Sequence, residues 1–110
     1  MVITGAGAGI GRACVERYVA EGAFVVAADR DDAALAALVA DVDGPIETVN
    51  VDVAEAGSAA TLVETSLSAF GRLDAYHANA GGALPTPFLE TDDERYDQVR
   101  ALNLDAVWQG

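Results

Sequence analysis

The sequence contains no lysine, one cysteine and one histidine among its 110 residues. A single cysteine excludes an internal disulfide framework and suits a reducing compartment, so we expect a cytoplasmic protein. Cys14 falls on the apolar face of the first predicted helix, and we interpret it as a small core residue. Because one cysteine, one histidine and scattered carboxylates make no cluster of ligands, we predict no metal site.

Long apolar runs are missing as well. No stretch approaches the roughly 18 residues of a membrane span, and no charged-then-apolar leader is present, so we expect no membrane partner. All six basic residues are arginine, and together with 18 acidic residues they give a formal net charge of −12. That charge argues against nucleic acid and anionic membrane surfaces as partners.

Glycine, by contrast, is concentrated near the start, where Thr4–Gly11 reads TGAGAGIG. The short β-like run Val2–Ile3 precedes it, and apolar residues at helical spacing follow it as far as Gly22. A strand, a tight glycine turn and a helix start bring free backbone N–H groups and the positive end of a helix dipole together. The pattern therefore predicts a phosphate-binding loop.

The rest of the chain alternates strands and helices without a linker or repeat. Strands are predicted at Phe24–Asp29, Ile46–Val53 and Leu73–Ala80, and helices at Asp31–Val42, Glu55–Phe70 and from the Thr91–Glu94 capping box to the end of the chain. Short connections between strands and helices indicate right-handed βαβ units. We predict an α/β fold, half of a doubly wound parallel sheet of strand order 3-2-1-4 in three αβα layers.

The glycine spacing distinguishes between nucleotide-binding loops. The fingerprint G-x-G-x-x-G fails, because its third glycine would fall on Ile10 or Arg12. The phosphate loop G-x-x-x-x-G-K-[ST] fails because the chain has no lysine. The spacing T-G-x-x-x-G-x-G fits, at Thr4, Gly5, Gly9 and Gly11.

With this spacing the sequence resembles the short-chain dehydrogenase/reductase family. Further matches occur in the family's order: Asp29 closes the second strand, Asp52-Val53 stands at the end of the third, Asn79-Ala80-Gly81 stands at the end of the fourth, and Asn103 stands in an N-L-x-A run. The resemblance covers the whole chain and implies a Rossmann-like fold. It also implies an oxidoreductase that interconverts an alcohol and a carbonyl in a small-molecule substrate, uses NAD(H) and forms a homo-oligomer when complete.

Each position of the glycine motif has a physical task. Gly5 permits the tight turn, Gly9 lets a pyrophosphate approach the backbone, and Gly11 lets helix and strand pack closely. Ile10 offers a backbone N–H at the helix start, while its side chain is expected to fill the core.

The strand ends supply the remaining predicted contacts. Asp29 is placed to accept hydrogen bonds from both adenosine ribose hydroxyls and to repel a 2′-phosphate, which favours NAD over NADP. The neighbouring Arg30 is the counter-argument, because it could pair with a phosphate. Asp52 and Val53 would clasp the adenine, one by a hydrogen bond and one by apolar contact, although Asp52 is interpreted equally well as a loop carboxylate that caps a helix. The stretch Asn79–Gly81 lies at the carboxyl end of the fourth strand, where ligands gather in such folds.

The sequence departs from the family in what it lacks. The family's catalytic serine and Tyr-x-x-x-Lys follow later in the chain, and of its catalytic groups only the supporting asparagine is matched, by Asn103. We therefore expect residues 1–110 to be an incomplete dinucleotide-binding domain, truncated before those residues and inactive alone. A nucleotide-binding remnant or a subunit-pairing fragment is the alternative. Methyl transfer from S-adenosylmethionine is a third, against which the glycine spacing and the Asn-Ala-Gly stretch count.

Three other features receive no catalytic role. Tyr96 and Arg100 imitate the missing motif as Y-x-x-x-R, but they precede Asn103, so we expect Tyr96 to be a packing or surface residue. We read His77 as a hydrogen-bonded filler. Trp108 is expected in a core or in a subunit contact.

Overall fold

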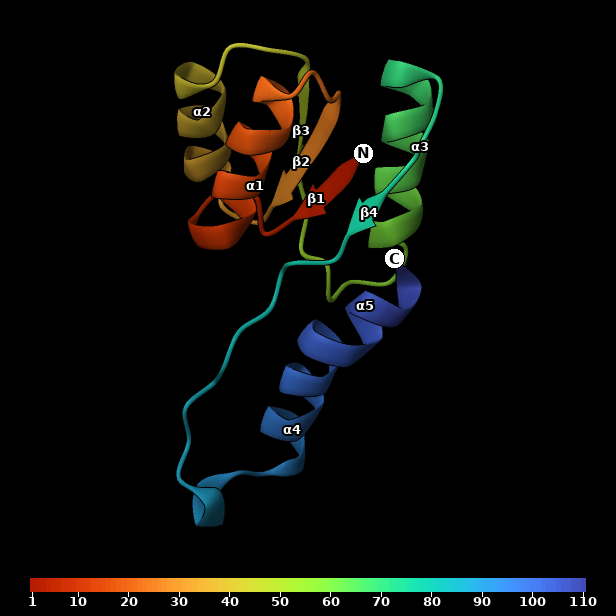
Figure 1. The fold of residues 1–110 in the computed structure, drawn as a ribbon. Coiled ribbons are helices and arrows are strands. Elements are labelled where there is room, and N and C mark those ends of the chain that lie inside the picture. Colours follow the sequence, from red (N-terminus) through yellow and green to blue (C-terminus); the bar gives the residue numbers. More distant parts are fainter.

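Four parallel strands form one sheet in the order β3-β2-β1-β4 in the computed structural model, which describes all of residues 1–110. The strands are β1 (Val2–Thr4), β2 (Val25–Asp29), β3 (Ile46–Asn50) and β4 (Tyr76–His77). Helices α1 (Gly9–Ala20) and α2 (Asp32–Asp41) lie on one face of the sheet, and α3 (Ser58–Phe70) lies on the other (Figure 1). The predicted fold class, strand order and layering are confirmed.

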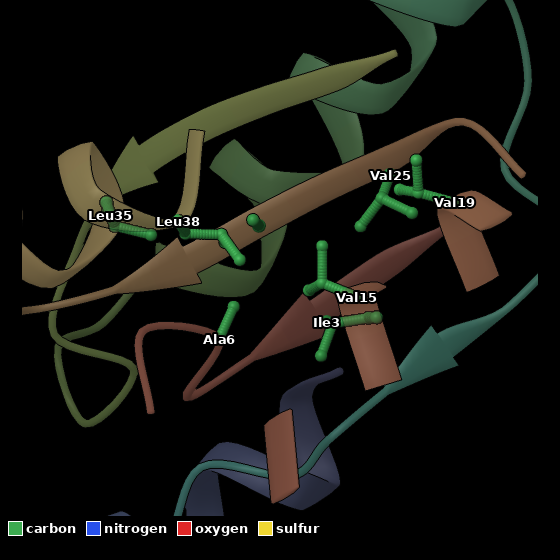
Figure 2. Close-up of a cluster of buried hydrophobic side chains, with 8 residues drawn as sticks. Ile3, Ala6, Val15, Val19, Val25, Leu35 and Leu38 are labelled. Atoms are coloured by element: carbon green, nitrogen blue, oxygen red, sulfur yellow. The ribbon is translucent and has the colours of Figure 1, made fainter. Parts of the chain in front are cut away.

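Alternating side chains along the central strands give the sheet two apolar faces, as the two-residue period of a strand requires. Ile3 points toward α1 and α2, whereas its neighbour Val2 points toward α3. The first face carries the larger cluster, drawn in Figure 2: Ile3, Ala6, Val15, Val19, Val25, Ala27, Leu35 and Leu38. The second consists of Val2, Val26, Ala28 and Leu62. The glycine loop and the strand ends are thus held by packing on both sides.

The buried stripe of α1 differs from the expected one. Gly11, Val15 and Val19 are buried, but the Ile10 side chain is 74% exposed, so the prediction that it fills the core is wrong. Gly11 packs against Gly5, in the glycine turn that precedes α1, and this contact sets the rotation of the helix. Val15 and Val19, four and eight residues further on, therefore face the sheet. Cys14, one position round the helix, is half-buried and packs against the larger cluster from its edge, so it is not one of the fully buried core residues.

Several strands and helices are shorter than predicted. The third strand ends at Asn50, and the following turns delay α3 to Ser58, with Gly57 in the left-handed conformation at its N-cap. Asp31 caps α2 as predicted, accepting the Ala34 N–H at 3.0 Å. The fourth strand is only Tyr76–His77, which pairs with Val2 and Ile3 of β1.

Beyond β4 the chain runs away from the sheet and returns (Figure 1). It forms the 3₁₀ turn η1 (Phe88–Glu90), α4 (Asp93–Arg100), the π-helical turn η2 (Ala101–Asp105) and α5 (Ala106–Gln109). The predicted capping box is wrong: Asp92 caps α4 by accepting the Arg95 N–H, while the Thr91 hydroxyl donates to the Pro87 carbonyl. Trp108 is 89% exposed and belongs to no core. None of these helices is long and apolar enough to cross a membrane.

The half-buried phenol of Tyr76 packs against the smaller cluster, and burial raises its pKa above the ordinary value of 10.0. Above that pH the unfolded chain loses this proton before the folded chain does, so this contribution to stability is present below pH 10.0 and is lost as pH rises. We predict that denaturant melts between about pH 9 and 11 lose stability more steeply in the unaltered chain than in Tyr76→Phe. Tyr96→Phe, at a 62% exposed position, is the control and should leave the slope unaltered. Equal slopes in all three proteins would contradict this account.

Candidate functional site

Close packing of backbone shapes the glycine turn between β1 and α1. Gly5 and Gly9 adopt positive φ angles of 65° and 55°, which glycine tolerates without strain. A Cβ on Gly11 would overlap the Gly5 carbonyl oxygen, so only glycine fits there. Gly9 has open space around it. The turn therefore ends with an uncovered backbone at the N-terminus of α1, whose first turn carries no acidic residue.

The Thr4 side chain joins this turn to the end of β4. Its hydroxyl oxygen accepts the backbone N–H groups of Asn79 and Ala80, both at 3.0 Å. The side-chain Nδ2 of Asn79 in turn donates to the backbone carbonyl of Thr4 at 2.9 Å. These bonds explain why β4 ends early: Asn79 and Ala80 bond to a side chain of β1 rather than to its backbone. Thr4 itself is 3% exposed and lies beneath the surface of the site.

Asp29, the last residue of β2, has both carboxylate oxygens anchored by backbone. Oδ2 accepts the Gly7 N–H at 2.8 Å and Oδ1 accepts the Asp31 N–H at 3.0 Å. A carboxylate has about four acceptor positions, so two remain for a ligand. Arg30 is exposed beside it, and the Arg30 carbonyl accepts from the Asn50 side chain at 3.2 Å.

Asp52 and Val53 lie in the turn after β3. Asp52 Oδ1 accepts the Ala54 N–H at 2.9 Å within the turn, whereas α3 begins after Gly57 without a side-chain cap, so the alternative interpretation of Asp52 as a helix cap is wrong. Val53 is 8% exposed, and its carbonyl accepts the Ser58 hydroxyl at 3.1 Å. Asp52 thus stabilises its own turn and borders the same space as Asp29.

Asn103 lies in the π-helical turn η2 and holds the loop after β4. Its Oδ1 accepts the Gly82 N–H at 3.0 Å, and its Nδ2 donates to the Gly82 carbonyl at 2.9 Å. The same Nδ2 donates to the Val99 carbonyl at 2.8 Å. A Cβ on Gly81 would stand 3.0 Å from Asn103 Oδ1. Asn103 therefore positions backbone at the edge of the site.

A cavity of about 670 Å³ runs along the carboxyl ends of the strands, within the range of small-molecule pockets. Most of the predicted site residues line it: Gly5, Gly9, Asp29, Arg30, Asp52, Val53, Asn79, Ala80 and Gly81. Thr4, Ile10, Gly11 and Asn103 do not. The structure thus brings the predicted strand-end residues together and places the others behind or beside them.

The far wall of the cavity was not foreseen. It is formed by Gln98, Val99, Ala101 and Leu102, from α4 and η2. No local motif marks these residues, because they reach the cavity only through the return of the chain after η1. Val51 and Ala54 also line the cavity and were not predicted. Their place on either side of the predicted Asp52-Val53 pair could have indicated them.

The remaining features singled out in the sequence lie outside this cavity. Tyr96 is exposed, and Arg100 pairs with Asp97 at 3.4 Å and Asp105 at 3.8 Å. His77 Nδ1 is buried without a hydrogen-bond partner, so the expected hydrogen-bonded filler is not found at that nitrogen. No group of three or more histidine, cysteine and acidic side chains is arranged to hold a metal ion.

Comparison with known proteins gives consistent matches. A family model described as short chain dehydrogenase matches residues 1–110. An L-xylulose reductase from Mesocricetus auratus is 44% identical over 108 residues, which are 98% of this chain and 42% of that protein. Among solved structures, a short-chain dehydrogenase/reductase from Brucella melitensis superposes with a TM-score of 0.93 at 34% identity, covering 98% of this chain and 45% of the other.

A 3-ketoacyl-(acyl-carrier-protein) reductase from Brucella melitensis, solved as a complex with NADH, superposes with a TM-score of 0.88 at 28% identity. It is covered to 45%, against 98% of this chain. The chain thus spans less than half the length of the relatives it matches. These superpositions confirm the Rossmann-like architecture.

The Thr4 hydroxyl accepts two backbone N–H groups where it is almost fully buried, so its removal should be costly. We predict that Thr4→Val, which keeps the shape and removes the oxygen, lowers the free energy of unfolding by about 1–3 kcal/mol. Thr4→Ser keeps the oxygen and should retain most of the stability. Denaturant unfolding of the three proteins measures this, and equal stability of Thr4→Val and the unaltered chain would show that the hydroxyl does not hold β4.

Proposed function

Because the chain belongs to the short chain dehydrogenase family, we propose that it supplies the NAD-binding half of an oxidoreductase that interconverts an alcohol and a carbonyl group. The observation that carries this proposal is the Asp29 carboxylate. It stands in the cavity wall beside the glycine turn, and its two oxygens are oriented by backbone N–H groups. The sequence resemblance to an oxidoreductase family is confirmed, whereas NAD, the substrate and the activity belong to the proposal.

The glycine turn would receive the pyrophosphate. Its backbone lies bare at Gly9, and the N-terminus of α1 brings unpaired N–H groups and the positive end of the helix dipole to the same point. Ile10, whose side chain points outward, would take part through its backbone only. Thr4 and Gly11 would shape the turn from behind.

The adenosine end would lie toward Asp29 and Asp52. The two acceptor positions left on Asp29 match the two hydroxyls of an adenosine ribose, and Val53 offers an apolar contact to the base. Across the cavity, Leu102 and Val99 supply apolar surface for a planar ring. Asn79, Ala80 and Gly81 would continue the site toward the reacting end of the cofactor.

Charge favours NAD over NADP. Two carboxylates, Asp29 and Asp52, line the cavity, and Arg30 is the single basic residue among the lining side chains. A 2′-phosphate would displace the ribose hydroxyl from Asp29 and place like charges together. The reductase solved with NADH shares this fold, which supports a nicotinamide cofactor here.

The chain would contribute binding rather than proton transfer. It contains no lysine and therefore no Tyr-x-x-x-Lys, and Asn103 is engaged with backbone of Gly82 and Val99. We propose that residues 1–110 form an incomplete dinucleotide-binding domain, since they match less than half of each relative. The proton-transfer groups and the pocket for a small-molecule substrate would belong to the complete enzyme, which we expect to be a cytoplasmic homo-oligomer.

We predict that the 110-residue chain binds NADH more tightly than NADPH, and that Asp29→Ala weakens NADH binding by about tenfold or more while changing NADPH little. Fluorescence titration with each nucleotide measures both dissociation constants. Asp32→Ala is the matched control, because it removes the same charge from the first turn of α2, and Asp32 neither bonds to Gly7 nor lines the cavity. Tighter binding of NADPH by the unaltered chain would mean that Arg30 determines the choice.

A further inference from the structure

Gly7 is a glycine that the turn itself does not require. It is not among the glycines with positive φ, so its backbone conformation is open to other residues. It does not line the cavity, and it is not one of the positions of the T-G-x-x-x-G-x-G spacing. Neither chain reversal nor close approach of a ligand therefore accounts for it.

The surroundings of Gly7 do account for it. A Cβ at this position would lie 2.7 Å from the Cβ of Ala34 and 3.0 Å from Asp29 Oδ2, both shorter than ordinary contacts. At the same time the Gly7 N–H donates to that oxygen at 2.8 Å. Gly7 is thus enclosed between the carboxylate at the end of β2 and the first turn of α2.

We propose that Gly7 is a positioning residue for cofactor selection: its N–H aims the Asp29 carboxylate into the cavity, and its missing side chain lets α2 approach closely enough to keep it there. The inference rests on the proposed function, because it concerns the part of the site that would read the adenosine ribose.

Hydrogen bonds connect the end of β2 to the start of α2. Asp29 Oδ1 is held by the Asp31 N–H, and the Asp31 side chain caps α2 at the Ala34 N–H. A methyl group on Gly7 must displace the Asp29 carboxylate, the first turn of α2, or both. In either case the hydrogen bond from the Gly7 N–H to Asp29 Oδ2 lengthens, and the carboxylate is no longer oriented toward the cavity.

The part of the glycine turn that would receive the pyrophosphate does not share these contacts. The close packing at Gly11 involves Gly5 and Asn79, and Gly9 has free space around it. A change at Gly7 should therefore weaken recognition of the ribose diol while leaving phosphate binding in place. Selectivity between NADH and NADPH should fall, rather than affinity for both.

The test is a set of fluorescence titrations of the 110-residue chain with NADH and NADPH, with a thermal melt of each variant. We expect Gly7→Ala to reduce the ratio of the NADPH to the NADH dissociation constant by about tenfold, the effect of one weakened charged hydrogen bond. In Gly7→Ala/Ala34→Gly the ratio should recover in part, because the 2.7 Å contact is removed. Ala33→Gly, at an exposed position in the same turn of α2, is the control for glycine in a helix and should not restore the ratio when combined with Gly7→Ala.

A second variant approaches the contact from the other side. Ala34→Val substitutes no residue of the glycine turn, but its larger side chain enters the space between α2 and Gly7. It should therefore also lower the ratio of the NADPH to the NADH dissociation constant, so the proposal can be judged even where Gly7→Ala fails to fold. A ratio unchanged in Gly7→Ala or in Ala34→Val, in a chain that binds NADH, would overturn this inference alone. If the unaltered chain bound neither nucleotide, the proposed function would fall and this inference with it.

Discussion

The contact between Gly11 and the Gly5 carbonyl is the constraint on which the rest of the site depends. It brings the start of α1 directly against the end of β1, because no side chain separates them. That approach turns Val15 and Val19 onto the sheet, where they join the larger apolar cluster, and it turns Ile10 outward. The N-terminus of α1 is consequently held at the carboxyl ends of the strands, beside the cavity.

Around that contact, hydrogen bonds of backbone groups to side chains replace the regular sheet. Thr4 ties β1 to the end of β4, Asp29 ties β2 to the glycine turn, and Asn103 ties the loop after β4 to η2. Each of these side chains serves two or more backbone partners, so each satisfies several groups that would otherwise lie unpaired at a strand end. The cavity is therefore preformed by these tertiary hydrogen bonds, and the Asp29 carboxylate in its wall is oriented before any ligand enters.

The sequence predicted what local chemistry decides. The parallel sheet follows from the alternation of apolar strands with helices, and the cap at Asp31 follows from its side chain alone. Residues at strand ends, such as Asp29 and Asn79, could be predicted to converge because parallel strands end at one edge of the sheet. The length of β4 and the outward turn of Ile10 could not, since they depend on tertiary contacts of Thr4 and Gly11. Leu102 reaches the cavity only through the path of the chain beyond β4, which no short pattern encodes.

The central claim is that the strand-end cavity takes a dinucleotide through the glycine turn and Asp29. Amide chemical shifts of the isotope-labelled chain, followed by NMR during titration with NADH, test it most directly. The account predicts saturable shifts at the backbone amides of Gly7, Gly9 and Asp31, with Ala80 following, and little change in the exposed first turn of α4. Shifts confined to α4 and α5, or no saturable shift at the glycine turn, would contradict it.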